Sequence, residues 1–197
     1  LYQVHWPDEE TPLEETLRAL DDLVRTGLVR YIGCSNYPAW LLAKSLWVSN
    51  VRSLVRFESL QPHYNLVHRA EFERELQPLC LDQEIGVIPY SPLAAGFLTG
   101  KYRRDSSLPD SERAGSIRER YMNDRGFTAV DKLEDIGRGH EATIAQTAVA
   151  WILANPAVTS AIIGANSVEQ LRDTMMGAEV ALSVEEKAAL DDTTAWD

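Results

Sequence analysis

The sequence has few cysteines, no long apolar run and fewer basic than acidic residues. Its two cysteines, Cys34 and Cys80, are too few for a disulfide framework. With no Cys-x-x-Cys motif and no Cys/His cluster, the sequence predicts no metal site. No apolar run approaches the roughly 20 residues that span a bilayer, so we expect no membrane segment. The 19 basic and 30 acidic residues give a net charge of −11, which argues against nucleic acid or an anionic membrane as a partner.

The chain begins Leu1-Tyr2-Gln3-Val4-His5, without an initiator methionine and without the basic and apolar regions of a signal peptide. Because the first apolar strand is also cut at its front end, we expect the sequence to start within a longer protein. The composition, 45% hydrophobic and 25% charged in 197 residues, is that of an ordinary globular domain. With so few cysteines, a cytoplasmic protein is the expectation.

Short apolar segments alternate with amphipathic ones along the chain. Strands are predicted to begin near residues 1, 29, 54, 85 and 160, and helices over about 11–26, 38–48, 69–83, 128–138, 143–154, 168–176 and from 184 onward. The first three spacings between strands, 28, 25 and 31 residues, are typical of βα units, which build a parallel sheet covered by helices. Such a sheet either stays open and doubly wound or closes into a (β/α)8 barrel.

Several helix ends carry signals in the sequence. Thr11 with Glu14 predicts a capping box at the first helix, and Gly27 is its expected C-terminal stop. Ser183 is expected to cap the last helix. Pro78 should end, kink or split the helix over 69–83, because proline lacks the backbone N–H that a helix interior needs.

Residues at the strand ends favour the barrel. No Gly-x-Gly-x-x-Gly follows any predicted strand, which weakens the dinucleotide-binding doubly wound alternative. Polar or special residues instead come directly after every strand: His5, Ser35, Asn36, Gln61, Tyr90, Ser91 and Gly164. A barrel builds its site from residues at these positions, so we expect an α/β fold of the barrel type.

The chemistry of these residues suits a carbonyl and a carboxamide. His5 can donate to a carbonyl oxygen and stabilise a developing alkoxide, although a histidine held by a backbone carbonyl is the alternative. Ser35 and Asn36 suit a carboxamide but also make good turns and caps. Gln61 is an amide whose burial at a strand end requires partners. Tyr90 offers a flat face for stacking, with core packing as the alternative.

Two segments later in the chain suit phosphate groups. Small residues in the run from Ser91 to Lys101 let a backbone approach an anion, and Lys101 adds a positive charge, but the spacing is not that of a P-loop. The helix that begins after Gly164 also suits an anion at its N-terminus, and a plain capped helix fits equally well. The polar stretch 101–123 is predicted to be a surface loop of the kind that closes over a site.

The remaining histidines and cysteines are not expected to take part. His63, His68 and His140 lie on polar segments and are predicted to face solvent. Cys34 lies close to the candidate site, but no His or Asp at motif spacing accompanies it, so we expect an inert thiol.

The order of the motifs is more specific than any one of them. The runs His5-Trp6-Pro7-Asp8, Gly33-Cys34-Ser35-Asn36, Gln61-Pro62-His63-Tyr64-Asn65, Pro89-Tyr90-Ser91-Pro92-Leu93-Ala94-Ala95-Gly96-Phe97-Leu98-Thr99-Gly100-Lys101-Tyr102 and Ile163-Gly164-Ala165-Asn166-Ser167-Val168-Glu169-Gln170-Leu171 follow one another in the chain. In this order they resemble the aldo-keto reductase superfamily, over essentially the whole chain. The resemblance implies a (β/α)8 TIM barrel that binds NADP(H) and reduces aldehydes or ketones by hydride transfer.

The resemblance also implies roles for single residues. His5 matches the catalytic histidine that orients and polarises the carbonyl, and Trp6 would line the substrate mouth. Tyr90 matches the aromatic residue stacked on the nicotinamide ring. The contacts to the nicotinamide carboxamide match Ser35, Asn36 and Gln61.

The rest of the cofactor would lie along the later motifs. The pyrophosphate loop matches Ser91, Leu93, Gly96, Leu98, Gly100 and Lys101, and the segment 101–123 resembles the belt that closes over it. The adenosine end matches Gly164, Asn166, Gln170 and Asp173. Asn166 and Gln170 stand where many relatives carry basic residues for the 2′-phosphate, and Thr174 where an adenine-contacting Asn is common. NADP(H) is therefore the expected cofactor, with NAD(H) not excluded.

The resemblance places only part of a barrel in this sequence. A barrel of about 250 residues has eight βα units, and the chain supplies roughly strands 4–8 with their helices as one domain over 1–197. The general-acid tyrosine of the family, with its Asp and Lys partners, matches no residue here, so the 197 residues alone are expected to be inactive. Two alternatives stay open: a short cofactor-binding protein without turnover, and a regulatory subunit like the potassium-channel β subunits.

Overall fold

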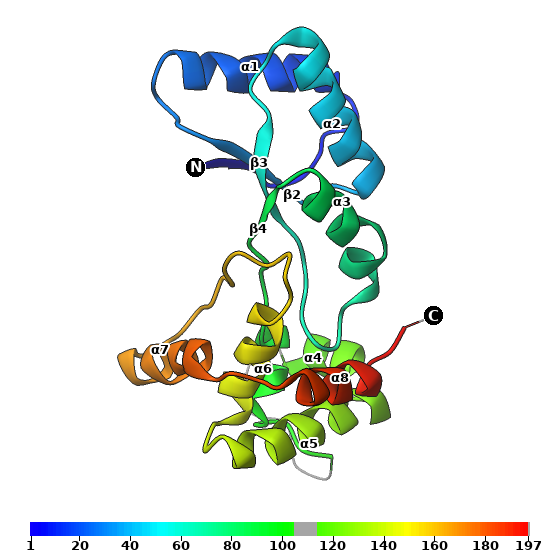
Figure 1. The fold of residues 1–197 in the computed structure, drawn as a ribbon, viewed down its shortest axis with the longest axis vertical. Helices are drawn as coiled ribbons and strands as arrows, with labels where there is room; N and C mark the ends of the chain where they lie inside the picture. Colours follow the sequence, from blue (N-terminus) through cyan, green and yellow to red (C-terminus); the bar gives the residue numbers. More distant parts are fainter. Residues whose placement is uncertain (105–113, 197) are drawn as a thin grey trace. The chain divides into compact units, whose positions relative to one another are not determined.

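Four short parallel strands form a single sheet in the chain order β1-β2-β3-β4. The computed structural model describes residues 1–104 and 114–196, which belong to two compact units. The first unit comprises Leu1–Pro62 and Glu71–Ile88, and the second comprises His63–Ala70 and the chain from Pro89 onward. Because consecutive parallel strands need a crossover, a helical segment follows each of the first three strands (Figure 1).

The first unit contains the whole sheet. Its strands are β1 (Tyr2–Val4), β2 (Ile32–Ser35), β3 (Phe57–Gln61) and β4 (Gly86–Val87). Its helices are α1 (Leu13–Arg25), α2 (Ala39–Arg52), the π-helical turn η1 (Phe72–Leu76) and α3 (Gln77–Asp82). Fully buried Leu17, Leu42, Phe57 and Leu60 belong to the core of this unit. The observed parallel sheet with crossover helices confirms the predicted α/β class.

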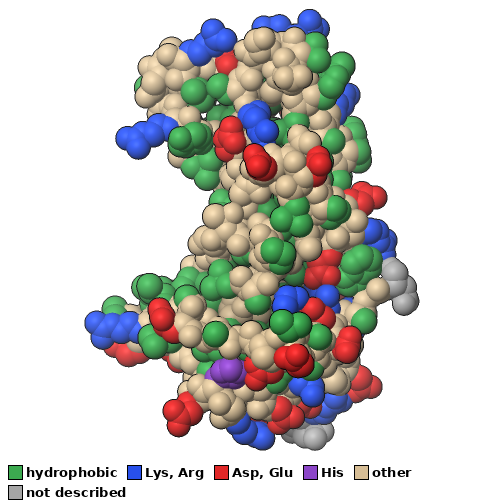
Figure 2. All heavy atoms as spheres, in the orientation of Figure 1, with side chains coloured by type: hydrophobic (Ala, Val, Ile, Leu, Met, Phe, Trp, Pro, Cys, Tyr) green, Lys and Arg blue, Asp and Glu red, His purple; other side chains and the backbone are tan. Residues whose placement is uncertain are grey.

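The second unit is helical in the residues that the structure describes. It contains the 3₁₀ segments η2 (Ala94–Thr99) and η3 (Met176–Glu179) and the helices α4 (Ala114–Tyr121), α5 (Asp124–Gly139), α6 (Ile144–Leu153), α7 (Val168–Met175) and α8 (Val184–Thr193). Its core includes the fully buried rings of Tyr64, Phe97 and Trp151. On the face drawn in Figure 2, acidic and basic side chains lie interspersed, with hydrophobic side chains between them.

Three details of the helix prediction are confirmed and one is wrong. The segment 69–83 is split into η1 and α3, with Pro78 in the first turn of α3. Gly27 follows α1 with a left-handed φ of 76°, and Ser183 caps α8 in a full capping box. Thr11 does not cap α1, because its hydroxyl donates to Asp8 over 2.7 Å and Pro12 occupies the N-cap position.

The predicted strand at 160–164 is also wrong. These residues form no strand, although the Ile162 N–H donates a hydrogen bond of 2.9 Å to the Pro89 carbonyl. Within the predicted loop 101–123, residues 114–121 form helix α4, whereas residues 105–113 lie outside the described part of the chain. No helix of the described residues is long and apolar enough to cross a membrane.

Candidate active site

His5 directly follows β1, at the carboxyl end of the sheet in the first unit. Its side chain is exposed, and its ring lies 5.9 Å from the ring of Trp6, tilted by 55°. The backbone carbonyl of His5 accepts a hydrogen bond of 2.9 Å from Nδ2 of Asn36. The end of β1 is therefore attached to the end of the neighbouring strand β2 by a side chain.

The ends of β2 and β3 are joined in the same way. Ser35 and Gln61 are partners in the parallel register, and Ser35 Oγ donates to the Gln61 carbonyl over 2.7 Å. Asn36 Nδ2 also donates to Ser35 Oγ, at 3.1 Å. A chain of hydrogen bonds thus connects His5, Asn36, Ser35 and Gln61 across three adjacent strands. The structure brings together all five site residues predicted in this unit, Trp6 included.

The backbone conformation of Asn36 directs its amide toward His5. Its φ is 58°, in the left-handed region that side chains other than glycine rarely adopt and that asparagine tolerates better than most. Positive φ at a non-glycine residue is a form of local strain that often accompanies a functional site. The position of Asn36 after a strand was predicted from the sequence, but its left-handed conformation was not.

A second set of neighbouring residues lies two positions earlier on the same strands. Gln3, Gly33 and Ser59 are register partners on β1, β2 and β3, and Ser59 Oγ donates to Gln3 Oε1 over 3.0 Å. A Cβ on Gly33 would lie 2.1 Å from Ser59 Oγ, so only glycine permits this contact. Sequence reasoning missed Gln3 and Ser59, although the alternation of side chains along β1 places Gln3 on the same face as His5.

In the second unit, Tyr90 is part of a stack of three rings. Residues 63 and 90 form a parallel bridge, and the His63 and Tyr90 rings lie 5.1 Å apart with an interplanar angle of 10°. His68 stacks behind His63, with ring centroids 4.0 Å apart. His63 and His68 are therefore partly buried in ring contacts, and the prediction that they face solvent is wrong. His140 is partly buried too and bonds Glu186 at 2.9 Å.

The segment from Ser91 to Lys101 has an unusual run of left-handed backbone. Positive φ occurs at Ser91, Ala94, Ala95, Gly96 and Gly100. For the alanines and the serine this costs roughly 1–2 kcal/mol each. Because strain of this kind clusters at ligand clamps, it supports a functional role for the segment.

The predicted phosphate contacts in this segment differ in exposure. Lys101 is exposed, and a Cβ on Gly96 would lie 3.0 Å from its Nζ, so the ammonium group occupies the space that glycine leaves open. Leu93 is half-buried, whereas the Leu98 side chain is fully buried. Gly100 is buried beside Ile144, which a Cβ would meet at 2.4 Å.

The residues predicted for the adenosine end lie at and near the N-terminus of α7. Gly164, Asn166, Gln170 and Asp173 are all exposed. Asn166 N–H donates to Gln170 Oε1 over 3.0 Å, while Gln170 N–H donates to the N-cap Ser167. The carboxylate of Asp173 accepts from Nε2 of Gln146 over 2.8 Å and so faces the start of α6. Asp173 therefore links two helices in this structure.

Both cysteines are buried and free. Burial raises the pKa of the Cys80 thiol to about 12, and burial together with the neighbouring Cys80 raises that of Cys34 still further. Such thiols do not form thiolates near neutral pH, which supports the predicted inert role of Cys34. In residues 1–104 and 114–196, no group of three or more His, Cys, Asp or Glu side chains could hold a metal ion.

Comparison with known proteins identifies the family. The model of the Aldo/keto reductase family matches residues 1–195, so the chain belongs to this family, as its motif order predicted. It is 35% identical over 98% of its length to a Bacillus subtilis protein described as an uncharacterized oxidoreductase, YrpG, and covers 57% of that protein.

Two further relatives show the range of the family. The chain is 34% identical over 89% of its length to an Arabidopsis thaliana protein described as a probable voltage-gated potassium channel subunit beta, of which it covers 55%. It resembles the structure of the thermostable aldo-keto reductase Tm1743 in complex with the inhibitor epalrestat, with a TM-score of 0.76 and 33% identity, over 98% of this chain and 58% of that one. The chain thus spans little more than half the length of these relatives.

Proposed function

We propose that the protein is an NAD(P)H-dependent reductase of small aldehydes and ketones. The hydrogen-bond chain from the His5 carbonyl through Asn36 and Ser35 to the Gln61 carbonyl carries this proposal, because it holds the backbone of His5, the carbonyl-binding residue, beside the three carboxamide-binding residues. The cofactor supplies a hydride when it is bound. A cytoplasmic location fits a protein that acts on NAD(P)H and small aldehydes or ketones.

His5 acts on the substrate oxygen in this proposal. Its exposed ring donates an N–H to the carbonyl oxygen, which orients the substrate and stabilises the negative charge that develops there. Trp6, 60% exposed beside His5, provides an apolar wall for the substrate. Ser35, Asn36 and Gln61 orient the carboxamide through their hydroxyl and amide groups.

The residues of the second unit fit a dinucleotide. Tyr90 offers a half-exposed ring for stacking, and the strained run 91–101 offers the ammonium group of Lys101 over the open side of Gly96. A lysine at this position attracts a pyrophosphate. Asn166 and Gln170 are neutral, so NADP(H) is proposed as the cofactor with NAD(H) as its competitor.

The proton for the alkoxide is proposed to come from a tyrosine outside these 197 residues. Loss of such a donor costs about 10²–10⁴-fold in rate, which is why the segment alone is proposed to be inactive. We propose that this segment contributes the later βα units of a (β/α)8 barrel. Activity is therefore measured on the protein expressed from its complete reading frame.

The test compares His5→Ala with His140→Ala. Oxidation of NADPH and of NADH is followed with a panel of aldehydes and ketones, and cofactor affinity is measured by fluorescence titration. His5→Ala should lower kcat by about 10²-fold and leave the Kd of the cofactor nearly unchanged. His140→Ala, which alters a contact with α8, should retain the wild-type kcat. Equal losses of kcat and affinity in His5→Ala would mean that His5 is structural.

A regulatory subunit is the second candidate, because one relative is described as a potassium channel subunit beta. Such a protein binds the cofactor and senses its redox state without needing rapid turnover. Stoichiometric NADPH binding with no turnover of any carbonyl in the panel would favour this function, and steady turnover would exclude it.

A further inference from the structure

His63 covers one face of the Tyr90 ring. The two rings are nearly parallel and 5.1 Å apart, and His68 supports His63 from behind at 4.0 Å. All three residues belong to the second unit. Because His63 lies against one face, a ligand ring that stacks on Tyr90 must use the opposite face.

Asn65 fixes the orientation of His63. Asn65 Oδ1 accepts from Val67 N–H over 3.1 Å, and Asn65 Nδ2 donates to the Ser91 carbonyl over 3.0 Å, so the direction of the amide is set by two bonds. Nδ2 also lies 3.4 Å from Nε2 of His63. Since an amide Nδ2 can only donate, it contacts Nε2 of His63 on the side of that atom's lone pair.

Helix α4 brings a second polar group close to the same nitrogen. The Tyr121 hydroxyl lies 3.4 Å from Nε2 of His63. Burial raises the pKa of Tyr121, so the hydroxyl keeps its proton and can donate. His63 is thus held at its ring faces by stacking and at Nε2 by two polar groups.

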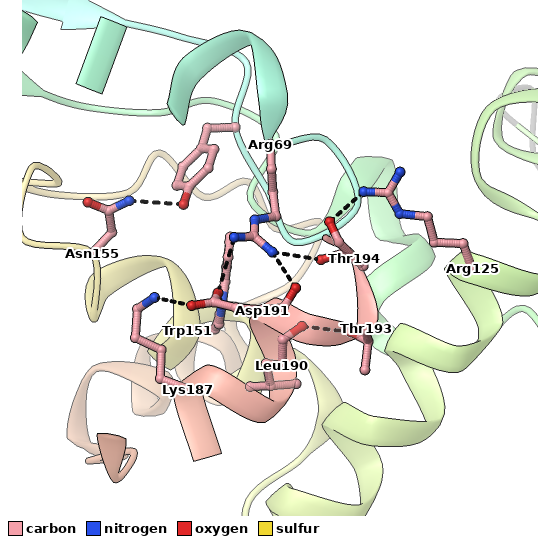
Figure 3. Close-up of polar contacts among 10 residues, drawn as sticks. Arg69, Arg125, Trp151, Asn155, Lys187, Leu190, Asp191, Thr193 and Thr194 are labelled. Carbon is pink, nitrogen blue, oxygen red and sulfur yellow. Dashed lines mark hydrogen bonds and ion pairs between the residues drawn. The ribbon is translucent and has the colours of Figure 1, made fainter. Parts of the chain in front are cut away.

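The segment that carries His63 is anchored at its other end. The Arg69 side chain, 9% exposed, donates to the Asp191 carbonyl over 2.6 Å and to Thr194 Oγ1 over 3.2 Å (Figure 3). Its guanidinium also lies 5.6 Å from the centre of the Trp151 ring. Tyr64, next to His63, accepts a buried bond of 2.9 Å from Asn155. Side-chain contacts therefore anchor the segment 63–70 to other parts of the second unit.

We propose that His63 is a positioning residue that holds the Tyr90 ring as a fixed platform for the nicotinamide ring of the cofactor. The inference rests on the proposed function, because it takes the stacked ligand to be NAD(P)H. His63 does not touch the reacting atoms and acts through Tyr90. The role requires a flat ring at position 63; the polar contacts at Nε2 help to orient that ring, while its stacking on Tyr90 supports the platform.

Two substitutions separate the effect of a flat ring at position 63 from the effect of side-chain volume there. His63→Phe keeps a planar ring against Tyr90, whereas His63→Leu fills the space without one. Aromatic pairing contributes enough that its loss should raise the Kd of NADPH about 2- to 10-fold in His63→Leu. His63→Phe should stay within about 2-fold of the wild type. His140→Leu is the control, because it replaces another partly buried histidine of the same unit.

The measurements are the Kd of NADPH by fluorescence titration, KM and kcat with one aldehyde, and the melting temperature. A purely structural role would lower the melting temperature without separating the Phe variant from the Leu variant in Kd. If His63→Leu does not fold, His68→Leu removes only the outer ring and is expected to raise the Kd by a smaller factor.

The outcomes are distinct. A raised Kd in His63→Leu, with a normal Kd in His63→Phe, supports the proposal. Equal Kd values in both variants, whether normal or raised, overturn it, as does a normal Kd in His68→Leu where His63→Leu is unfolded. If the unsubstituted protein does not bind NADPH, the proposed function is overturned as well. Because this failure is seen without any substitution, it is distinguishable from a failure of the inference about His63.

Discussion

The side-chain amide of Asn36 donates a hydrogen bond of 2.9 Å to the backbone carbonyl of His5, 31 residues earlier in the chain. The same nitrogen donates to Ser35, which itself donates to Gln61. The position of the proposed catalytic histidine therefore depends on a donor from the next strand. Removing that donor should displace His5 without altering its chemistry.

Asn36→Asp tests this dependence. Aspartate tolerates the left-handed φ of 58° but presents an oxygen to the His5 carbonyl where asparagine presents a donor. We expect the free energy of unfolding to fall by about 1 kcal/mol. We expect kcat to fall about tenfold, because small displacements of a reacting group are costly. The matched control is Asn50→Asp on the exposed side of α2, and an equal kcat in both variants would contradict the dependence.

Asp191 is the acceptor that holds α8 against α6 and the anchored segment 63–70. Its carboxylate accepts from Nε1 of Trp151 over 2.9 Å and from Nζ of Lys187 over 2.7 Å, and it lies 3.5 Å from Arg69 (Figure 3). Asp191→Asn removes the charge while Arg69 remains nearly buried, so the free energy of unfolding should fall by about 1–3 kcal/mol. Chemical denaturation measures this loss, and Asp192→Asn, one residue further and exposed, should change it by less than about 0.5 kcal/mol. Equal effects would show that the network contributes little.

Gly126 lets α5 begin directly after α4. A Cβ at this position would lie 2.0 Å from the backbone oxygen of Tyr121, the residue whose hydroxyl faces His63. Gly126→Ala should therefore cost about 1–3 kcal/mol in the free energy of unfolding. Gly139→Ala, at the other end of the same helix, meets nothing within 4 Å and should be neutral or stabilising. A melting temperature for Gly126→Ala as high as that for Gly139→Ala would refute this account.

The buried thiols should resist alkylation in the folded protein. Because burial raises the pKa of Cys80 to about 12 and that of Cys34 further, neither forms the reactive thiolate at about pH 8. Iodoacetamide followed by peptide mass spectrometry should leave both residues unmodified in the native state and modify both in guanidinium chloride. Rapid native labelling of Cys34 would reopen a reactive role for this residue beside the candidate site.

Sequence reasoning found the residues at the strand ends because their position requires only the alternation of strands and helices. Ser35, Asn36 and Gln61 follow predicted strands, and parallel pairing brings such ends to one edge. Their hydrogen bonds could not be predicted, because these depend on the register Ser35↔Gln61 and on the left-handed φ of Asn36. Gly33 shows the same limit, since its need for a missing Cβ appears only when Ser59 lies opposite.

The errors also have physical causes. The apolar run at 160–164 predicted a strand, but short apolar runs do not by themselves distinguish a strand from other buried segments, and these residues form no ladder. Thr11 was expected to cap α1, but Asp8 binds its hydroxyl. His63 was expected to face solvent because its stacking partner Tyr90 lies far along the chain, and only the pairing of residues 63 and 90 brings the rings together.

Glu186 makes the start of α8 sensitive to acid. The Ser183 backbone N–H and the His140 ring bind its carboxylate and hold the pKa of Glu186 below its usual value of 4.5. A carboxylate whose pKa is lower in the folded state stabilises the fold above the unfolded-state pKa, and this stability is lost as the pH falls through the folded-state pKa.

Glu186→Gln removes this pH dependence, because glutamine does not titrate. Gln146 in α6 shows that glutamine also completes a capping box. Melting temperatures should therefore drop more steeply from about pH 5 to pH 3 in the wild type than in Glu186→Gln. Glu185→Gln, in the same exposed turn, should follow the wild type, because Glu185 lacks the capping contact. If Glu186→Gln also follows the wild type, the capping carboxylate is not what acid removes.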